Sequence, residues 1–164
     1  DWLTYACYNS GEKNMLNMCR TSSRNEFIAG LSEEETRSAV RQRGIADVRE
    51  FRTLQAKDFD AIVIPGGWAP DRLRRYKEVL DFVRELNSAG KVVAAICHAG
   101  WVLASAGIIK GKNLTSFSAI KDDMINAGAL YSDKEVVVDG NLITSRKPAD
   151  LPAFCREIIK ALGR

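Results

Sequence analysis

Cys97 and His98 are the two residues of this sequence whose types and placement best suit catalysis. They follow directly after the apolar run Val92–Ile96 and precede an apolar helical pattern over residues 101–106. A thiol between a buried parallel strand and a helix lies just beyond the carboxyl end of the strand, where α/β folds place nucleophiles and ligands. Backbone N–H groups and the dipole at the helix start are expected to lower the pKa of the Cys97 thiol towards neutrality. The pair therefore predicts a cysteine nucleophile, with a buried, unreactive thiol as the alternative.

His98 is the only histidine of the 164 residues. This count excludes any site that needs two or more imidazoles from one chain, including most multi-histidine zinc centres. An imidazole base within one chain must therefore be His98, although a satisfied core or surface imidazole is the alternative. Adjacent residues on a turn need not face each other, so the sequence leaves open whether this ring reaches the Cys97 sulfur. The backbone N–H groups of His98 and of the turn Gly66-Gly67 are candidates for an oxyanion hole.

Short apolar runs alternate with amphipathic helical patterns along the chain, which is typical of a parallel sheet covered by helices on both faces. The expected strands are residues 2–8, 27–29, 61–64, 92–96, 114–117, 135–138 and 142–145. The expected helices are 15–19, from a short apolar stripe, and 70–89, 101–106, 120–127 and 150–162. The charged stretch 32–52 is either a hairpin or a surface excursion. We expect an α/β fold with a mainly parallel central sheet and a single domain over residues 1–164, because neither a repeat nor a linker interrupts the pattern.

Composition and charge exclude several classes of protein. Hydrophobic residues make up 46% and charged residues 27%, and the net charge is +3, which is typical of a globular protein without a nucleic-acid footprint. The basic cluster Arg72, Arg74, Arg75 and Lys77 is interpreted as a solvated surface. Four cysteines without a C-x-x-C pair indicate a reducing compartment. The sequence has neither a membrane-spanning run nor a signal-peptide start, so we expect a cytoplasmic protein without a membrane partner. We also expect no metal, no cofactor and no nucleic-acid partner.

Four blocks of the sequence, residues 58–71, 95–98, 120–128 and 136–141, carry a family resemblance. In order and spacing they resemble the PfpI intracellular protease family of the ThiJ/PfpI superfamily, whose fold is of the class I glutamine amidotransferase type. Residues 1–57 match that family only in outline. The resemblance implies a flavodoxin-like three-layer sandwich with the nucleophile on a strained elbow, in agreement with the pattern of elements.

The resemblance also implies a composite catalytic site. Cys97 pairs with His98, and an acidic side chain from a neighbouring subunit, here Asp71, orients the imidazole. Asp71 equally suits the first turn of a helix as a stabilising acid. A glutamate after the first strand, here Glu12 by its spacing, is implied to donate a hydrogen bond from its protonated carboxyl to the thiolate. The borrowed acid implies at least a homodimer, and the family commonly builds hexamers as trimers of dimers, which would place the basic residues beside Asp71 near an interface.

Four residues are expected to line the substrate site, namely Gly66, Trp68, Trp101 and Phe117. Two departures from the family pattern affect its walls. The Gly-Pro pair that usually follows the histidine is replaced by Ala99-Gly100, with Trp101 next, which makes this wall bulkier. Phe117 stands where many relatives carry a tyrosine, so the chain lacks a proton donor there, which disfavours efficient peptide hydrolysis.

Three functions fit these residues, and the first is preferred. A cysteine-dependent hydrolase of the PfpI peptidase type would use the Cys97 thiolate to attack a peptide carbonyl. The same cysteine would serve a glutathione-independent glyoxalase or deglycase that acts on α-oxoaldehydes such as methylglyoxal, with Glu12 or His98 moving the proton from carbon. A redox stress sensor without enzymatic activity would oxidise Cys97 to a sulfinic acid. A glutamine amidotransferase fits poorly, because its triad needs a histidine downstream of the nucleophile's helix and this sequence has none.

Overall fold

A six-stranded sheet lies at the centre of the computed structural model, which describes residues 16–21, 40–45 and 48–163. The strands are β1 Leu16–Thr21, β2 Val40–Ile45, β3 Ala61–Ile64, β4 Val92–Ile96, β7 Val136–Asp139 and β8 Leu142–Ser145. Their order is β2-β1-β3-β4-β8-β7. Because β3, β4 and β8 are parallel neighbours and the other pairs are antiparallel, four of the six strands (β2, β3, β4 and β8) run in the same direction. A separate parallel pair joins β5 Asn113–Leu114 to β6 Leu130–Tyr131.

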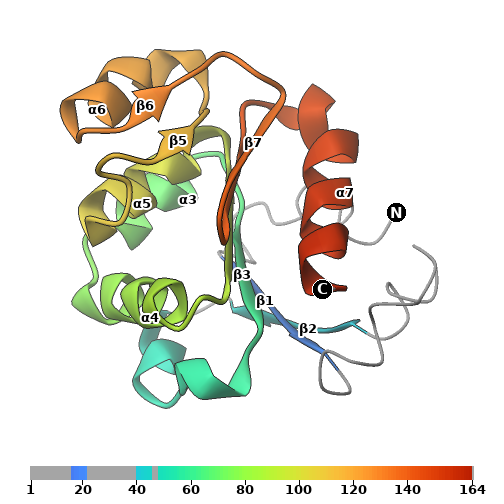
Figure 1. Ribbon diagram of the computed structural model, residues 1–164. Coiled ribbons are helices and arrows are strands. Elements are labelled where there is room, and N and C mark those ends of the chain that lie inside the picture. The colour runs from blue at the N-terminus through green and yellow to red at the C-terminus, as the bar shows by residue number, and fades with distance from the viewer. Residues whose placement is uncertain (1–15, 22–39, 46–47, 164) are drawn as a thin grey trace.

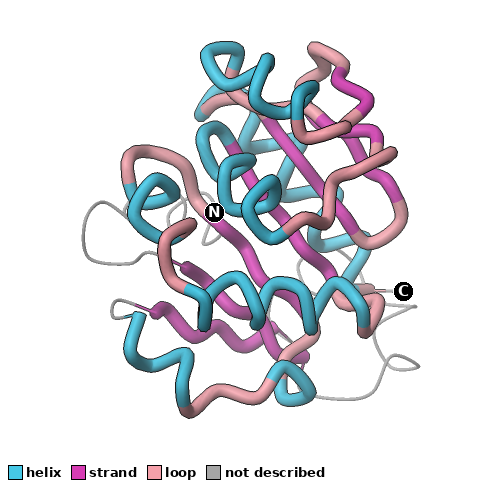
Figure 2. Tube along the Cα trace, turned by 90° about the vertical axis from the view of Figure 1, so that its left-hand side faces the viewer, coloured by secondary structure: helices cyan, strands magenta, loops and turns pink. Residues whose placement is uncertain are grey.

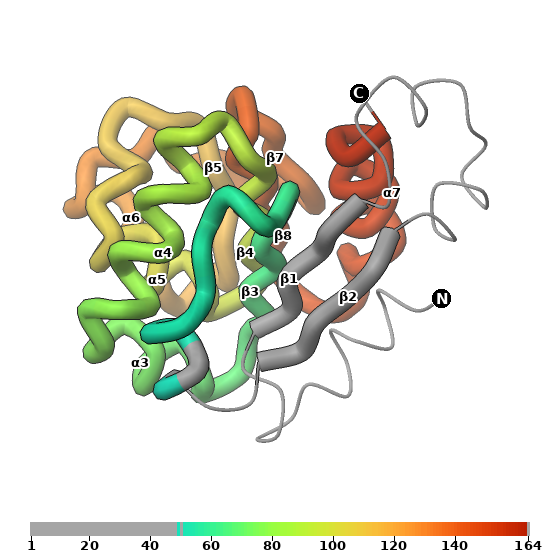
Figure 3. Tube along the Cα trace, turned by 90° about the horizontal axis from the view of Figure 1, so that it is seen from below, coloured from blue at the N-terminus to red at the C-terminus, as the bar shows by residue number. Residues whose placement is uncertain are grey.

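Helices cover both faces of the sheet. The helices are α3 Ala69–Leu73, α4 Lys77–Ser88, α5 Gly100–Ala106, α6 Lys121–Asn126 and α7 Leu151–Leu162. Figure 1 shows α3, α4 and α5 on one side of the strands, with α6 beside α5, and α7 on the other side. In Figure 2 the helices of the α4 side lie in front of the strands. Figure 3 shows the same layers from below. The arrangement is a three-layer sandwich of the flavodoxin type, as the sequence predicts.

Alternating side chains of the two central strands divide the core between these layers. Ile62 and Ile64 of β3 lie in the core below α4 and α5, whereas Ala61 and Val63 face the layer of α7. All four are fully buried, and β4 is buried along its whole length. Each buried valine or isoleucine side chain contributes about 1.5–3 kcal/mol relative to an exposed one. These strands therefore form a rigid support for the loops at their carboxyl ends.

Several predicted elements are confirmed, among them the strands β3, β4, β7 and β8 and the helices α5 and α7. The turn Asp139-Gly140-Asn141 joins β7 to β8 as an antiparallel hairpin. The predicted helix 120–127 is present as a 3-10 turn Ser118–Ile120 that leads into α6. Within the described residues, no helix is both long and apolar enough to cross a membrane.

Three predictions of secondary structure are wrong. The apolar stripe 15–19 is not helical, because β1 occupies residues 16–21 and pairs on both sides, with β2 and with β3. The single helix 70–89 is two helices, since the extended backbone of Tyr76 interrupts it between α3 and α4. The strand 114–117 ends at Leu114. The predicted strands 2–8 and 27–29 lie outside the described residues, and of the stretch 32–52 the structure describes β2 and a 3-10 helix Val48–Arg52.

Candidate active site

Cys97 stands on a strained turn directly after β4. Its φ is 62°, and it is the one residue other than glycine with a positive φ among those described. Such a conformation costs an L-residue on the order of 1–3 kcal/mol and persists only where the surroundings impose it. Here the extended Ile96 ends β4, and residues Cys97–Ala99 form a 3-10 turn that leads into α5. The predicted elbow is therefore present, and the half-buried Cys97 packs at the edge of the core on the α7 side of the sheet.

The turn after β3 closes on this elbow from one side. Because Ile64 of β3 is level with Ala95 of the parallel strand β4, the two strand ends lie side by side at the same edge of the sheet. A Cβ atom at Gly66 would stand 2.6 Å from the Cys97 Cβ and 3.2 Å from its Sγ. Gly67 follows with a φ of 75°, a region that glycine adopts without strain. The sequence Gly66-Gly67 thus permits a close approach that a side chain would prevent.

The side chains of Cys97 and His98 face each other. The Cys97 Sγ lies 3.3 Å from the Nδ1 of His98. Burial lowers the pKa of His98, so its imidazole is neutral near pH 7 and is able to accept a proton at Nδ1 in the tautomer protonated on Nε2. The contact that the sequence leaves open is therefore present, in a geometry that suits proton transfer from the thiol.

The pKa of the Cys97 thiol differs from the sequence prediction. Burial raises the pKa of Cys97, and backbone hydrogen bonds from His98 and Gly67 lower it without reversing the shift. The prediction of a lowered pKa is thus wrong for the described chain, because removal of the half-buried sulfur from water outweighs the two N–H donors. Burial therefore favours the protonated thiol, and a neighbouring base would assist its ionisation. The same two N–H groups, of Gly67 and His98, lie at the sulfur, where the sequence places its oxyanion candidates.

Three aromatic rings surround the His98 imidazole. The ring of Phe117 lies 4.9 Å from it and that of Trp101 5.1 Å, measured between centroids. Trp68 stacks on it at 6.1 Å although its own side chain is 79% exposed. The backbone N–H of Phe117 donates to the Cys97 carbonyl oxygen at 3.3 Å, which ties this wall to the elbow. Three of the four predicted lining residues thus lie around one imidazole, and the fourth, Gly66, lies against Cys97.

Two predicted acidic residues of the site, Asp71 and Glu12, stay predictions. Asp71 lies in the first turn of α3 with an exposed side chain, which agrees with both interpretations of this acid. Glu12 lies outside the described residues. Among the residues that the structure describes, no group of three or more histidine, cysteine, aspartate or glutamate side chains is able to hold a metal ion.

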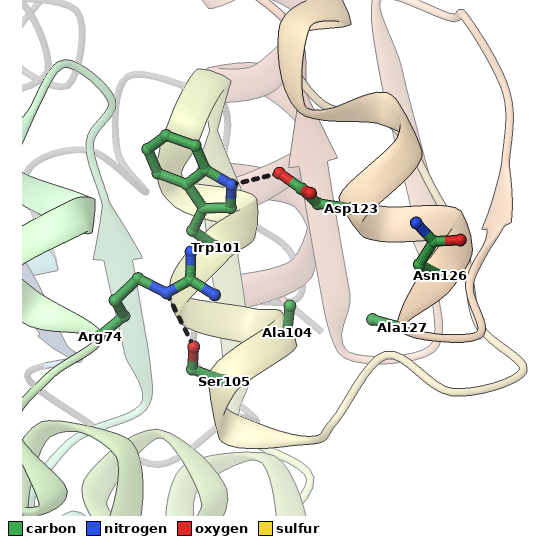
Figure 4. A pocket seen from close by; sticks show the side chains of 7 residues that line it. All are labelled: Arg74, Trp101, Ala104, Ser105, Asp123, Asn126 and Ala127. Atoms are coloured by element: carbon green, nitrogen blue, oxygen red, sulfur yellow. Dashed lines mark hydrogen bonds between the residues drawn. The ribbon is translucent and has the colours of Figure 1, made fainter.

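The sequence does not reveal a pocket that Trp101 lines. We call it the Trp101 pocket; it has a volume of about 360 Å³ and is lined by Arg74, Trp101, Ala104, Ser105, Asp123, Asn126 and Ala127 (Figure 4). The interpretation of the basic cluster as a solvated surface does not hold for Arg74, which is partly buried against the indole, whereas Arg72 and Arg75 are exposed. The hydrophobic periodicity of the sequence does not distinguish Arg74 from Arg72 and Arg75, because the burial of Arg74 depends on the break between α3 and α4.

The sequence is similar to that of several known proteins. The family model described as DJ-1/PfpI family matches residues 27–161. An Escherichia coli protein named "Protein/nucleic acid deglycase 2" is 49% identical over 153 residues, covering 87% of this chain and 89% of that protein. A Bacillus subtilis protein named "Putative cysteine protease YraA" is 47% identical over 109 residues, covering 66% of this chain and 64% of that protein.

Solved structures agree on the fold. A two-domain protein of Anabaena variabilis, containing DJ-1/ThiJ/PfpI-like and ferritin-like domains, is similar with a TM-score of 0.70 and 46% sequence identity. The similarity covers 75% of this chain and 35% of that protein. The likeness therefore concerns the α/β sandwich described above.

Proposed function

The chain belongs to the DJ-1/PfpI family, and on this basis we propose that it is a cysteine-dependent deglycase that releases amines from their α-oxoaldehyde adducts. One observation carries the proposal. The Cys97 sulfur faces the neutral His98 imidazole at 3.3 Å, and three aromatic rings lie around that imidazole. Such a site suits a small carbonyl carbon better than an extended peptide. The deglycase name of the Escherichia coli relative supports the same choice.

The proposed reaction starts from a methylglyoxal hemiaminal, in which the amine nitrogen is bonded to the former aldehyde carbon. His98 takes the thiol proton at Nδ1 while Cys97 forms a C–S bond to that carbon. The C–N bond breaks, and the amine leaves with the proton. The product on the enzyme is a hemithioacetal of Cys97.

Proton transfer and hydrolysis complete the cycle. A base moves the proton from the hemithioacetal carbon to its neighbour, which converts the group into a lactoyl thioester. The N–H groups of Gly67 and His98 are proposed to stabilise the oxyanions of these steps. Water then cleaves the thioester, so that adduct and water yield amine, lactate and the free thiol. No oxidant or reductant is consumed.

The proposal predicts lactate and free amine in equal amounts from the methylglyoxal adduct of a simple amine. The measurement follows both products by chromatography and includes free methylglyoxal at matched concentration, so that removal of dissociated aldehyde is recognised. A fluorogenic peptide amide is assayed in parallel. Peptide cleavage without lactate formation would replace the deglycase by a peptidase, and inactivity on both substrates would end the proposal.

A peptidase of PfpI type, the first hypothesis from the sequence, becomes the second candidate. The name of the Bacillus subtilis relative favours it, and the same Cys97 and His98 would perform acyl transfer. Against it stand the aromatic side chains around His98 and the lack of a hydroxyl at Phe117.

We further propose that Asp71 completes the site of a second copy of the chain by orienting its His98. Asp71→Ala is then expected to lower kcat on the order of 10²-fold, because a mispositioned imidazole transfers protons less efficiently. Co-expression of Asp71→Ala with Cys97→Ala chains, each with its own affinity tag, provides the measurement. Mixed oligomers recover activity, because one site then combines an intact thiol with an intact partner carboxylate.

The single-variant oligomers are the controls for this experiment. Activity of the mixed oligomers that stays at the level of Asp71→Ala alone would show that Asp71 does not act across subunits. Size-exclusion chromatography with light scattering on the same samples determines whether the assembly is a dimer or a hexamer.

A further inference from the structure

The Trp101 pocket contains two opposite charges that are not paired with each other. Arg74 donates from Nε to the Ser105 Oγ at 3.0 Å, and its guanidinium carbon lies 5.5 Å from the centre of the Trp101 ring. Among the residues that the structure describes, this is its one side-chain hydrogen bond, and it forms no ion pair with them. Both terminal NH₂ groups are therefore available to an anion at the pocket.

Asp123 supplies the negative charge. Its Oδ2 accepts a hydrogen bond from the Trp101 Nε1 at 2.7 Å, which leaves the other carboxylate oxygen available. The described part of the chain offers it no lysine or arginine partner within ion-pair distance. Figure 4 shows the guanidinium and the carboxylate reaching the same indole from different elements, Arg74 from the turn after α3 and Asp123 from α6. A ligand with one charge of each sign would satisfy both.

We propose that the Trp101 pocket binds the α-amino-acid head group of the substrate, with its carboxylate on Arg74 and its ammonium group on Asp123. The inference rests on the proposed deglycase function and names its substrate class, which is free amino acids that carry an α-oxoaldehyde adduct on a long side chain. Charge-assisted hydrogen bonds to a guanidinium are among the strongest available to a carboxylate.

Trp101 connects the pocket to the chemistry. The Arg74 guanidinium lies over the Trp101 ring, and the centre of the same ring lies 5.1 Å from the centre of the His98 imidazole. In this proposal, a lysine or arginine side chain held at its head group extends along the indole towards Cys97. Nucleotide adducts fit less well, because a phosphate dianion would meet the Asp123 carboxylate.

Calorimetric titration tests the head-group site without any turnover. The probes are L-norleucine, which is zwitterionic and has an unreactive side chain, and N-acetyl-norleucine amide, which lacks both charges. The wild-type protein is expected to bind the zwitterion at least about tenfold more tightly than the neutral probe, a ratio that corresponds to about 1.4 kcal/mol. Arg74→Gln and Asp123→Asn each abolish this preference. Arg75→Gln and Asp122→Asn remove the same charges from neighbouring residues outside the pocket and preserve it.

Competition kinetics test the link to the reaction. Methylglyoxal adducts of L-arginine and of Nα-acetyl-L-arginine amide are compared, and the ratio of their kcat/KM values is expected to fall from about ten to about one in Arg74→Gln, mainly through KM. Equal binding of both norleucine probes by the wild-type protein, or a preference for an adenosine monophosphate adduct, would overturn the head-group site. If neither adduct is processed while the norleucine preference depends on Arg74, the site stands and the deglycase function fails.

Discussion

Replacement of Cys97 by alanine is expected to reduce lactate formation from methylglyoxal adducts at least about 10³-fold, because no other group of the site is able to form the covalent intermediate. The fold is expected to survive, since the substitution removes a sulfur that is only half-buried and releases no buried charge. The measurement compares initial rates of lactate and amine release at saturating substrate. Circular dichroism of the same preparation verifies the fold.

Cys155→Ala is the matched control. Cys155 is a second cysteine among the described residues, and it is buried in α7. Its replacement is expected to lower stability by about 1 kcal/mol through the loss of packing and to leave turnover unchanged. Turnover by Cys97→Ala at the level of Cys155→Ala would remove the thiol from the mechanism.

Gly66→Ala is expected to lower kcat on the order of 10²-fold in a protein that still folds. The new methyl group would stand 2.6 Å from the Cys97 Cβ and 3.2 Å from the carbonyl oxygen of Ile96. Neither atom is able to withdraw, because one belongs to the strained elbow and the other to β4. The elbow must therefore shift, which separates the sulfur from the His98 Nδ1. Thermal unfolding is expected to show a loss of about 1–3 kcal/mol from the overpacking.

Gly100→Ala tests whether the loss of activity depends on which atoms the new methyl group contacts. At Gly100 the nearest atom is the Met124 Sδ at 2.8 Å, which belongs to a flexible side chain that is able to move away. This variant is expected to retain most of its activity. Equal losses for both variants would mean that the Gly66 contact has no special part in positioning Cys97.

The parts of the fold that follow from local pattern are those that the sequence predicts well. The buried runs at β3 and β4 read as parallel strands because each is apolar throughout, and the proline and glycine after β3 mark its end. The stripe at 15–19 is misleading because a short apolar spacing fits a helix and a strand alike. These residues form a strand because they pair with β2 and β3, and this pairing is a property of the whole sheet.

In the candidate site, too, the local sequence predicts some features, whereas others depend on three-dimensional packing. The sequence places Cys97 and His98 on one turn, but their contact depends on the φ of 62° at Cys97, which three-dimensional packing imposes. The direction of the Cys97 pKa shift was missed because the sequence reveals the N–H donors of a turn and not how deeply the sulfur is buried. Arg74 was missed because its contact with Trp101 joins two elements that are distant in sequence.

The central claim is that Cys97 forms a covalent intermediate with the former aldehyde carbon of the adduct. It is tested most directly by rapid acid quenching during turnover of a methylglyoxal adduct, followed by peptide mass spectrometry. The claim predicts one methylglyoxal equivalent on the peptide that contains Cys97, appearing and decaying at the rate of lactate formation and absent from Cys97→Ala. Full turnover with Cys97 unmodified at every time point, or with modification confined to lysine, arginine or Cys155, would contradict it.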